Sequence, residues 1–87
     1  MTRQQELERI HQWLVNHDVK LYDTPQDAAA DLANLNKTSP EQSQWRVLST
    51  TCTGSRWQWF LYREDAIADT TDTLSMFYRS DGKILYF

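Results

Sequence analysis

The sequence predicts an α+β domain in which two N-terminal helices pack on an antiparallel β-meander of about four strands. Two observations carry this prediction. Residues 1–43 hold two helical patterns, and residues 44–87 are rich in the β-branched and aromatic types that fit a pleated sheet. With 87 residues, of which 40% are apolar and 13% aromatic, the composition is that of a folded chain. We therefore expect residues 1–87 to form a single domain.

The first helix is predicted over residues 3–16, where Leu7, Ile10 and Leu14 recur at i, i+3 and i+7 with Trp13 beside them. Residues 19–22 are expected to form either a short strand or an extended connector. A second helix is predicted to begin at Thr24, because Thr is a good N-cap and Pro25 follows at the first helical position. Its inward residues are expected to be Ala28, Leu32 and Leu35.

The stretch from residue 44 to residue 63 reads as a hairpin interrupted at Gly54-Ser55. A two-residue loop at Gly54-Ser55 would set Arg46 opposite Arg63, a pair of like charges. We expect instead a three-residue loop, Cys52 to Gly54, with Gly54 at positive φ. That register puts on one face Trp45, Val47, Ser49, Trp57, Trp59 and Leu61. The other face then holds Arg46, Leu48, Thr50, Gln58, Phe60 and Tyr62.

Residues 64–71 are expected to form a connector with one helical turn that points Ile67 inward. Residues 73–79 alternate between apolar and polar, which predicts a third strand. Its apolar side should carry Leu74, Met76 and Tyr78. Ser80-Asp81-Gly82 is a strong turn signal before a last strand over residues 83–87.

The helices are expected to cover one face of the sheet, which leaves an apolar patch on the other. That patch would contain Leu48, Phe60, Tyr62, Phe77, Leu85 and Phe87. Because monomers seldom expose so large an apolar patch, we predict a protein interface there. The predicted anchors are Phe60, Tyr62 and Phe77, with Leu48 and Arg46 beside them. The alternative is that the helices divide between the two faces, or that the register differs, so that these residues form the core.

The sequence shows no recognisable catalytic chemistry, and we expect no enzyme activity, no cofactor and no metal. His11 is interpreted as a satisfied histidine at the edge of the core, and His17 lacks the i, i+4 spacing of a helical metal pair. Cys52 has no neighbouring base in the sequence. Neither Asp27 with Asp31 nor the acidic cluster in residues 64–72 has the ligand pattern of a calcium loop.

The favoured hypothesis is a small cytoplasmic, non-enzymatic protein that acts through a protein interface, as a homodimer or by docking on a larger partner. A single cysteine favours a reducing compartment, and we expect no signal peptide and no membrane association. The alternative is binding of single-stranded nucleic acid by an aromatic and arginine platform on the sheet. Its members would be Arg46, Arg56, Phe60, Tyr62, Phe77 and Arg79. The net charge of −3 makes this alternative the weaker one.

Overall fold

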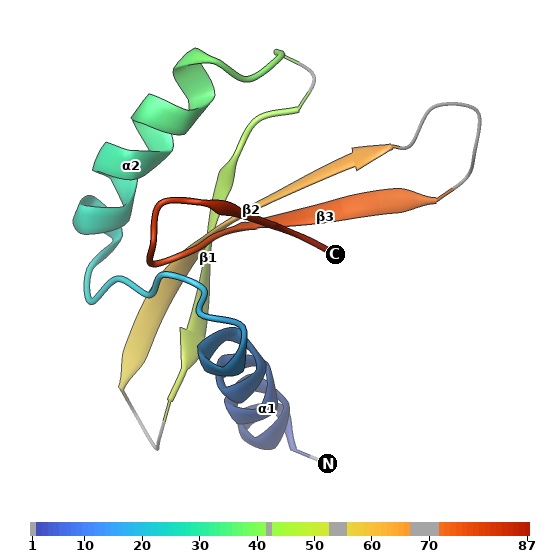
Figure 1. The fold of residues 1–87 in the computed structure, drawn as a ribbon. Helices are drawn as coiled ribbons and strands as arrows, with labels where there is room; N and C mark the ends of the chain where they lie inside the picture. Colours follow the sequence, from blue (N-terminus) through green and yellow to red (C-terminus); the bar gives the residue numbers. More distant parts are fainter. Residues whose placement is uncertain (1, 42, 53–55, 67–71) are drawn as a thin grey trace.

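The fold consists of two helices followed by a four-stranded antiparallel sheet, as predicted (Figure 1). A computed structural model describes residues 2–41, 43–52, 56–66 and 72–87. The elements in chain order are α1 (Arg3–Asn16), α2 (Pro25–Lys37), β1 (Arg46–Thr51), β2 (Trp57–Ala66), β3 (Thr73–Tyr78) and β4 (Ile84–Tyr86). Neighbouring strands pair in the order β1-β2-β3-β4, which makes β1 and β4 the two edges of the sheet.

Both helices begin where the sequence places them, because each has an N-cap threonine. The Thr2 hydroxyl accepts a hydrogen bond from the Gln5 N–H at 3.3 Å, and the Gln5 side chain accepts one from the Thr2 N–H at 3.0 Å. This reciprocal pair is a capping box. The Thr24 hydroxyl accepts from the Asp27 N–H at 3.2 Å, with Pro25 at the first helical position.

The β1–β2 register gives the predicted faces, although the loop between the strands is displaced. Val47 pairs with Leu61, and Ser49 pairs with Trp59. The Cys52 N–H donates to the Arg56 carbonyl at 3.2 Å, so Cys52 is paired with Arg56 and is not part of the predicted loop. A shift of two residues preserves the faces because side chains alternate with a period of two. The predicted conformation of Gly54 lies outside the described residues.

β2 is longer than predicted, since it continues through Ala66. Glu64 pairs with Ser75, and Asp65 with Leu74, so these two acidic residues belong to a strand and not to a connector. The predicted inward placement of Ile67 lies outside the described residues. The turn before β4 is confirmed: Gly82 has a φ of 82°, a value that favours glycine.

The prediction that both helices cover one face is wrong, because α1 and α2 pack on opposite faces. Ala28 of α2 lies in a buried cluster with Tyr22, Trp45, Leu61 and Met76. A second cluster places Leu14 of α1 with Val19 and Phe60 on the other face. Each face of the hairpin carries large apolar side chains, so each needs a covering layer. The alternative stated for the sequence, in which the helices divide between the faces, is the correct one.

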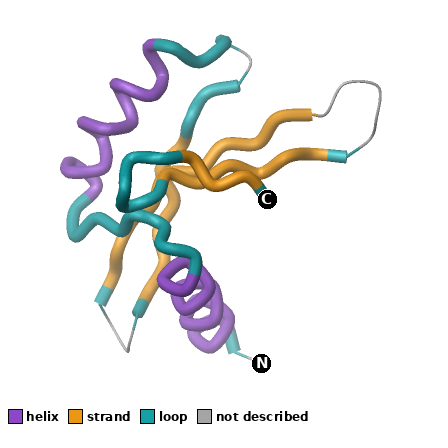
Figure 2. The backbone as a smooth tube through the Cα atoms, viewed as in Figure 1, coloured by secondary structure: helices purple, strands orange, loops and turns teal. Residues whose placement is uncertain are grey.

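The segment between the helices is a connector that pairs with the sheet at two isolated points. Tyr22 and Trp59 exchange two backbone hydrogen bonds of 2.8 and 2.9 Å, and Val19 forms a bridge with Arg79. The connector therefore lies beside β2 where the pairing of β3 with β2 has ended. Figure 2 shows this loop running from α1 to α2 across the strands. By crossing the sheet, it allows successive helices to reach different faces.

Candidate functional site

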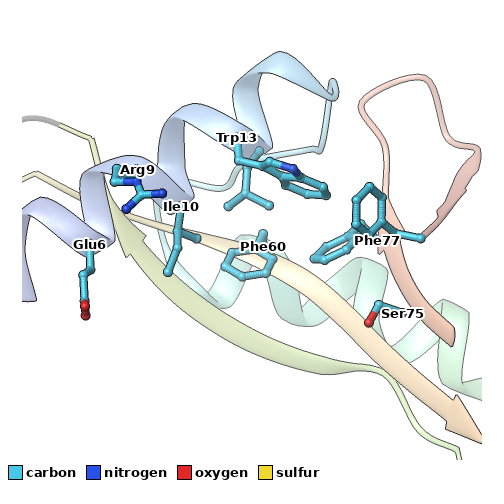
Figure 3. A pocket seen from close by; sticks show the side chains of 9 residues that line it. Glu6, Arg9, Ile10, Trp13, Phe60, Ser75 and Phe77 are labelled. Atoms are coloured by element: carbon cyan, nitrogen blue, oxygen red, sulfur yellow. The ribbon is translucent and has the colours of Figure 1, made fainter. Parts of the chain in front are cut away.

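An apolar groove of about 530 Å³ lies between α1 and the sheet, and it is here called the α1 groove. Its apolar lining consists of Ile10, Trp13, Leu14, Phe60, Phe77 and Phe87. Glu6, Arg9 and Ser75 supply its polar groups. Figure 3 shows Ile10 and Trp13 projecting from α1 toward Phe60 and Phe77, with Glu6 and Arg9 at the opposite end from Ser75.

Aromatic contacts fix one end of the α1 groove. The Trp13 ring lies 5.2 Å from the Phe77 ring and 5.1 Å from the Phe87 ring, the latter edge to face. On its other side, Trp13 stacks on His17 at 4.0 Å. The Trp13 ring is therefore held between the helix end and the sheet, and it forms a pre-shaped wall. Preformed, mostly apolar walls with a few polar groups are typical of binding sites.

The structure brings the predicted interface residues onto one face but does not leave all of them open. Phe60 is only 5% exposed, so its role as an open anchor is corrected: Leu14 and Val19 cover it, and it forms the floor of the α1 groove. Tyr62 and Phe77 are half-buried, with ring centroids 5.6 Å apart. Leu48 is 42% exposed beside Phe60, its partner across the strands.

Three other exposed or half-buried apolar residues of the α1 groove come from outside the predicted anchor set. Ile10 is 47% exposed and Phe87 is 66% exposed, while Trp13 is half-buried. Ile10 was predicted to point inward with Leu7 and Leu14. The sequence did contain a signal for this exposure. The apolar stripe of the first helix, with Trp13 included, is too wide for every member to contact the sheet.

Beyond the groove, the same face continues as a more polar surface around Tyr62. Burial, followed by a hydrogen bond with Glu64, raises the pKa of the Tyr62 hydroxyl above its usual range. Arg46 pairs with Tyr62 across the strands and is exposed at the edge of this surface. The apolar groove is thus continuous with a polar margin, the arrangement found at protein interfaces.

The arginines of the predicted nucleic-acid platform are mostly neutralised by carboxylates. Arg56 forms a salt bridge with Asp23 at 2.9 Å. Arg79 lies 3.2 Å from Asp81 and 3.8 Å from Asp18. Two of the proposed stacking rings, Phe60 and Phe77, are packed against other side chains. This face is therefore poorly suited to stacking the bases and neutralising the phosphates of a single-stranded nucleic acid.

The histidines and the cysteine do not line the α1 groove. His11 is buried at 9% exposure, and its Nδ1 has no hydrogen-bond partner among the described residues, so the predicted satisfied histidine is corrected. The His17 Nδ1 lies 2.8 Å from the Trp13 carbonyl oxygen. The Cys52 thiol donates to the Arg56 carbonyl at 3.7 Å. None of these three side chains is therefore among the described lining residues of the groove.

Within the described ranges, no group of three or more His, Cys, Asp or Glu side chains is placed to hold a metal ion. No helix in this part of the chain has the length and apolar character needed to span a membrane. No protein-family model, curated protein or solved structure matches the chain.

Proposed function

We propose that this chain is a small non-catalytic domain that acts by docking on another protein through the α1 groove and the sheet surface beside it. The observation that carries the proposal is that three of the six exposed large apolar side chains in the described residues lie on or beside one apolar groove. Ile10, Leu48 and Phe87 are each more than two-fifths exposed, and all three lie on or beside the groove. Leaving such side chains in water is unfavourable by roughly 25 cal/mol per Å², which a partner would recover.

A binding role is favoured over catalysis by what lines the groove. Acid–base or nucleophilic catalysis needs a base within hydrogen-bond reach of the reacting group. The polar groups of the lining are Glu6, Arg9 and Ser75, at different ends of the groove (Figure 3). Such groups can orient a partner at the margin of an apolar contact. The cytoplasmic location predicted from the single cysteine remains part of the proposal.

Docking on a different protein is favoured over self-association because the site is concave. A two-fold dimer places the same patch of each copy against the other, and two concave surfaces leave a poorly filled space between them. A different partner can supply a convex surface. Self-association remains the competing outcome, and it is distinguished by the mass of the protein in solution.

Two matched variants of α1 test the proposal. Ile10 lines the groove and Val15 does not, yet their exposures are nearly equal at 47% and 48%. Proteins captured from an extract of the source cells are identified by mass spectrometry with the wild type, Ile10→Glu and Val15→Glu. We expect at least one protein that binds the wild type and Val15→Glu but binds Ile10→Glu about tenfold less. Equal capture by the two variants would exclude the α1 groove as the docking site.

A further inference from the structure

We infer that the occupant of the α1 groove is an amphipathic helix of the partner protein, which lies beside α1 on the same face of the sheet. This inference rests on the proposed function and adds the kind of element that is recognised. Helices dock into apolar grooves through side chains at i, i+3 or i+4 and i+7. Four properties of the described surface favour this occupant: its shape, the state of the sheet edges, the outer sides of α1 and α2, and its charges.

The first property is the shape: α1 packs on this face of the sheet, and the groove lies beside it. α1 is fixed over the end of β1, where the Thr50 hydroxyl donates to the Leu7 carbonyl at 3.0 Å. Its last turns reach Phe77 through Trp13. The groove beside it has a helix as one wall and strands as its floor (Figure 3). Because helices in a layer pack about 8–10 Å apart, a second helix on this floor would meet the exposed side of Ile10.

An added strand is disfavoured as the occupant because it would need the backbone of an edge strand, and the floor of the groove lies on inner strands. Phe60 is on β2 and Phe77 is on β3, and both strands have a partner on each side. On the β1 edge, the backbone groups of Ser49 do point outward, because those of Trp59 are used by Tyr22 on the side away from β1. No described residue of β1 lines the groove, so a strand added there would lie outside it.

The occupying helix comes from a different protein, because both described helices use their apolar sides internally. α1 is polar on its outer side, where Gln5, Glu8 and Gln12 lie, and Val15 is a single exposed apolar residue there. The exposed side of α2 carries Gln26, Asp27, Asn34 and small alanines. Neither helix can therefore offer a second apolar stripe to the groove of a neighbouring copy.

One charge specifies the chemistry of the partner helix. Glu6 and Arg9 lie at the same end of the groove, so that end carries both signs of charge and favours neither (Figure 3). Exposed Arg46 lies beyond Tyr62 on the sheet and forms no salt bridge with another residue in the described ranges. We therefore expect a helix with an apolar stripe and an acidic residue facing Arg46. Such rim charges act mainly on specificity and association rate.

Two displayed peptide libraries test the inference on the full chain. Both contain peptides of about 14 residues, the length of roughly four helical turns. One fixes apolar residues at i, i+3, i+4 and i+7 in a helix-forming background, and the other alternates apolar and polar residues as in a strand. Selected peptides are synthesised, and their dissociation constants are measured with the wild type, Ile10→Glu, Val15→Glu and Phe87→Ser. Circular dichroism of each variant confirms that it is folded.

We expect the helical library to yield binders whose dissociation constants rise about tenfold or more with Ile10→Glu and with Phe87→Ser, and stay unchanged with Val15→Glu. Arg46→Glu should weaken peptides with an acidic flank and favour those with a basic one. Enrichment of the alternating library alone, or of neither library, would overturn the inference, as would equal binding by the Ile10 and Val15 variants. If extract proteins still depend on Ile10 in that case, the proposed function survives and the helical occupant does not. A dimer that is stable at low protein concentration and that Ile10→Glu dissociates would refute both.

Discussion

His11 is the residue whose burial has the clearest consequence for stability. It lies on α1 at 9% exposure, and its Nδ1 has no partner among the described residues. Burial, and then the positive charge of Arg56, lower the pKa of His11 below its usual value of 6.5. The unfolded chain therefore takes up the proton first as the pH falls. The contribution of neutral His11 is complete above pH 6.5 and is lost as the pH drops through the folded-state pKa.

We predict that the free energy of unfolding of the wild type decreases from pH 7.5 to pH 5.5, and that His11→Leu decreases less over the same range. The Leu variant removes both the titrating group and the unpaired Nδ1, so at pH 7.5 its stability should be within about 1 kcal/mol of the wild type or higher. Urea unfolding at several pH values measures this. His17→Leu is the control, and a pH slope in the His11 variant equal to that of the wild type would contradict the prediction.

Individual residues also show where sequence reasoning was sufficient and where it was not. The helix starts at Thr2 and Thr24 depend on local hydrogen bonds, and the Thr24 start could be predicted from four residues of sequence. The conformation of the chain just after α1 could not be predicted in this way. Asp18 adopts a φ of 60°, a conformation usually taken by glycine, and it is held there by Ser80, far away in the chain. A long-range contact of this kind leaves no local pattern.

At the scale of elements, the connector between the helices is tied to α2 by a polar contact at the edge of the core. The Tyr22 hydroxyl donates to Asp31 Oδ2 at 2.5 Å, and the Lys20 ammonium donates to the same oxygen at 3.0 Å. These bonds hold the pKa of Asp31 below its ordinary range, and burial raises that of Tyr22. The contact fixes where α2 lies after the chain has crossed the sheet.

We predict that Tyr22→Phe lowers the free energy of unfolding by about 1–2 kcal/mol, because a partly buried hydrogen bond to a charged group is lost while the ring stays in the core. The pKa of Asp31 should rise toward its ordinary value, since the largest cause of its depression is removed. Urea unfolding and an NMR titration of the carboxylate measure the two effects. Tyr86→Phe, at an exposed site, should change neither. An unchanged Asp31 titration in Tyr22→Phe would show that the bond contributes little.

The elements themselves were largely predictable, while the interaction between them was not. Alternation in residues 73–79 and the pattern of residues 3–16 were sufficient to identify β3 and α1. The choice of face for α1 depends on the pairing of Tyr22 with Trp59, which no periodicity reports. Because α1 packs on the face that carries Phe60, Phe60 is a buried floor residue of the groove and not an open anchor. Ile10 lies at the exposed rim of the same groove. The predicted anchors and the α1 groove therefore lie on the same face, but only Phe60 and Phe77 belong to both sets.

At the scale of the whole molecule, the position of α1 determines how much apolar surface remains for association. A stable dimer buries about 800 Å² on each partner, with close fit at its centre. The α1 groove is hollow, and the polar margin around Glu64 and Arg46 borders it. A second copy presenting the same hollow surface would bury the rim and leave the floor empty. The uncovered surface is accordingly better suited to a convex partner than to a copy of itself.

We therefore predict that the purified chain is a monomer, with a mass near 10.3 kDa by light scattering over a wide range of protein concentration. Weak association at the highest concentrations should be reduced by Ile10→Glu and not by Val15→Glu, because only the first lines the groove. Ionic strength should have little effect, since the surface that associates is apolar. A stable species of twice this mass at low concentration would contradict the prediction. If Ile10→Glu then restored the monomer, the groove would be a site of self-association, and the exposed Leu48 and Phe87 would be covered by the second copy.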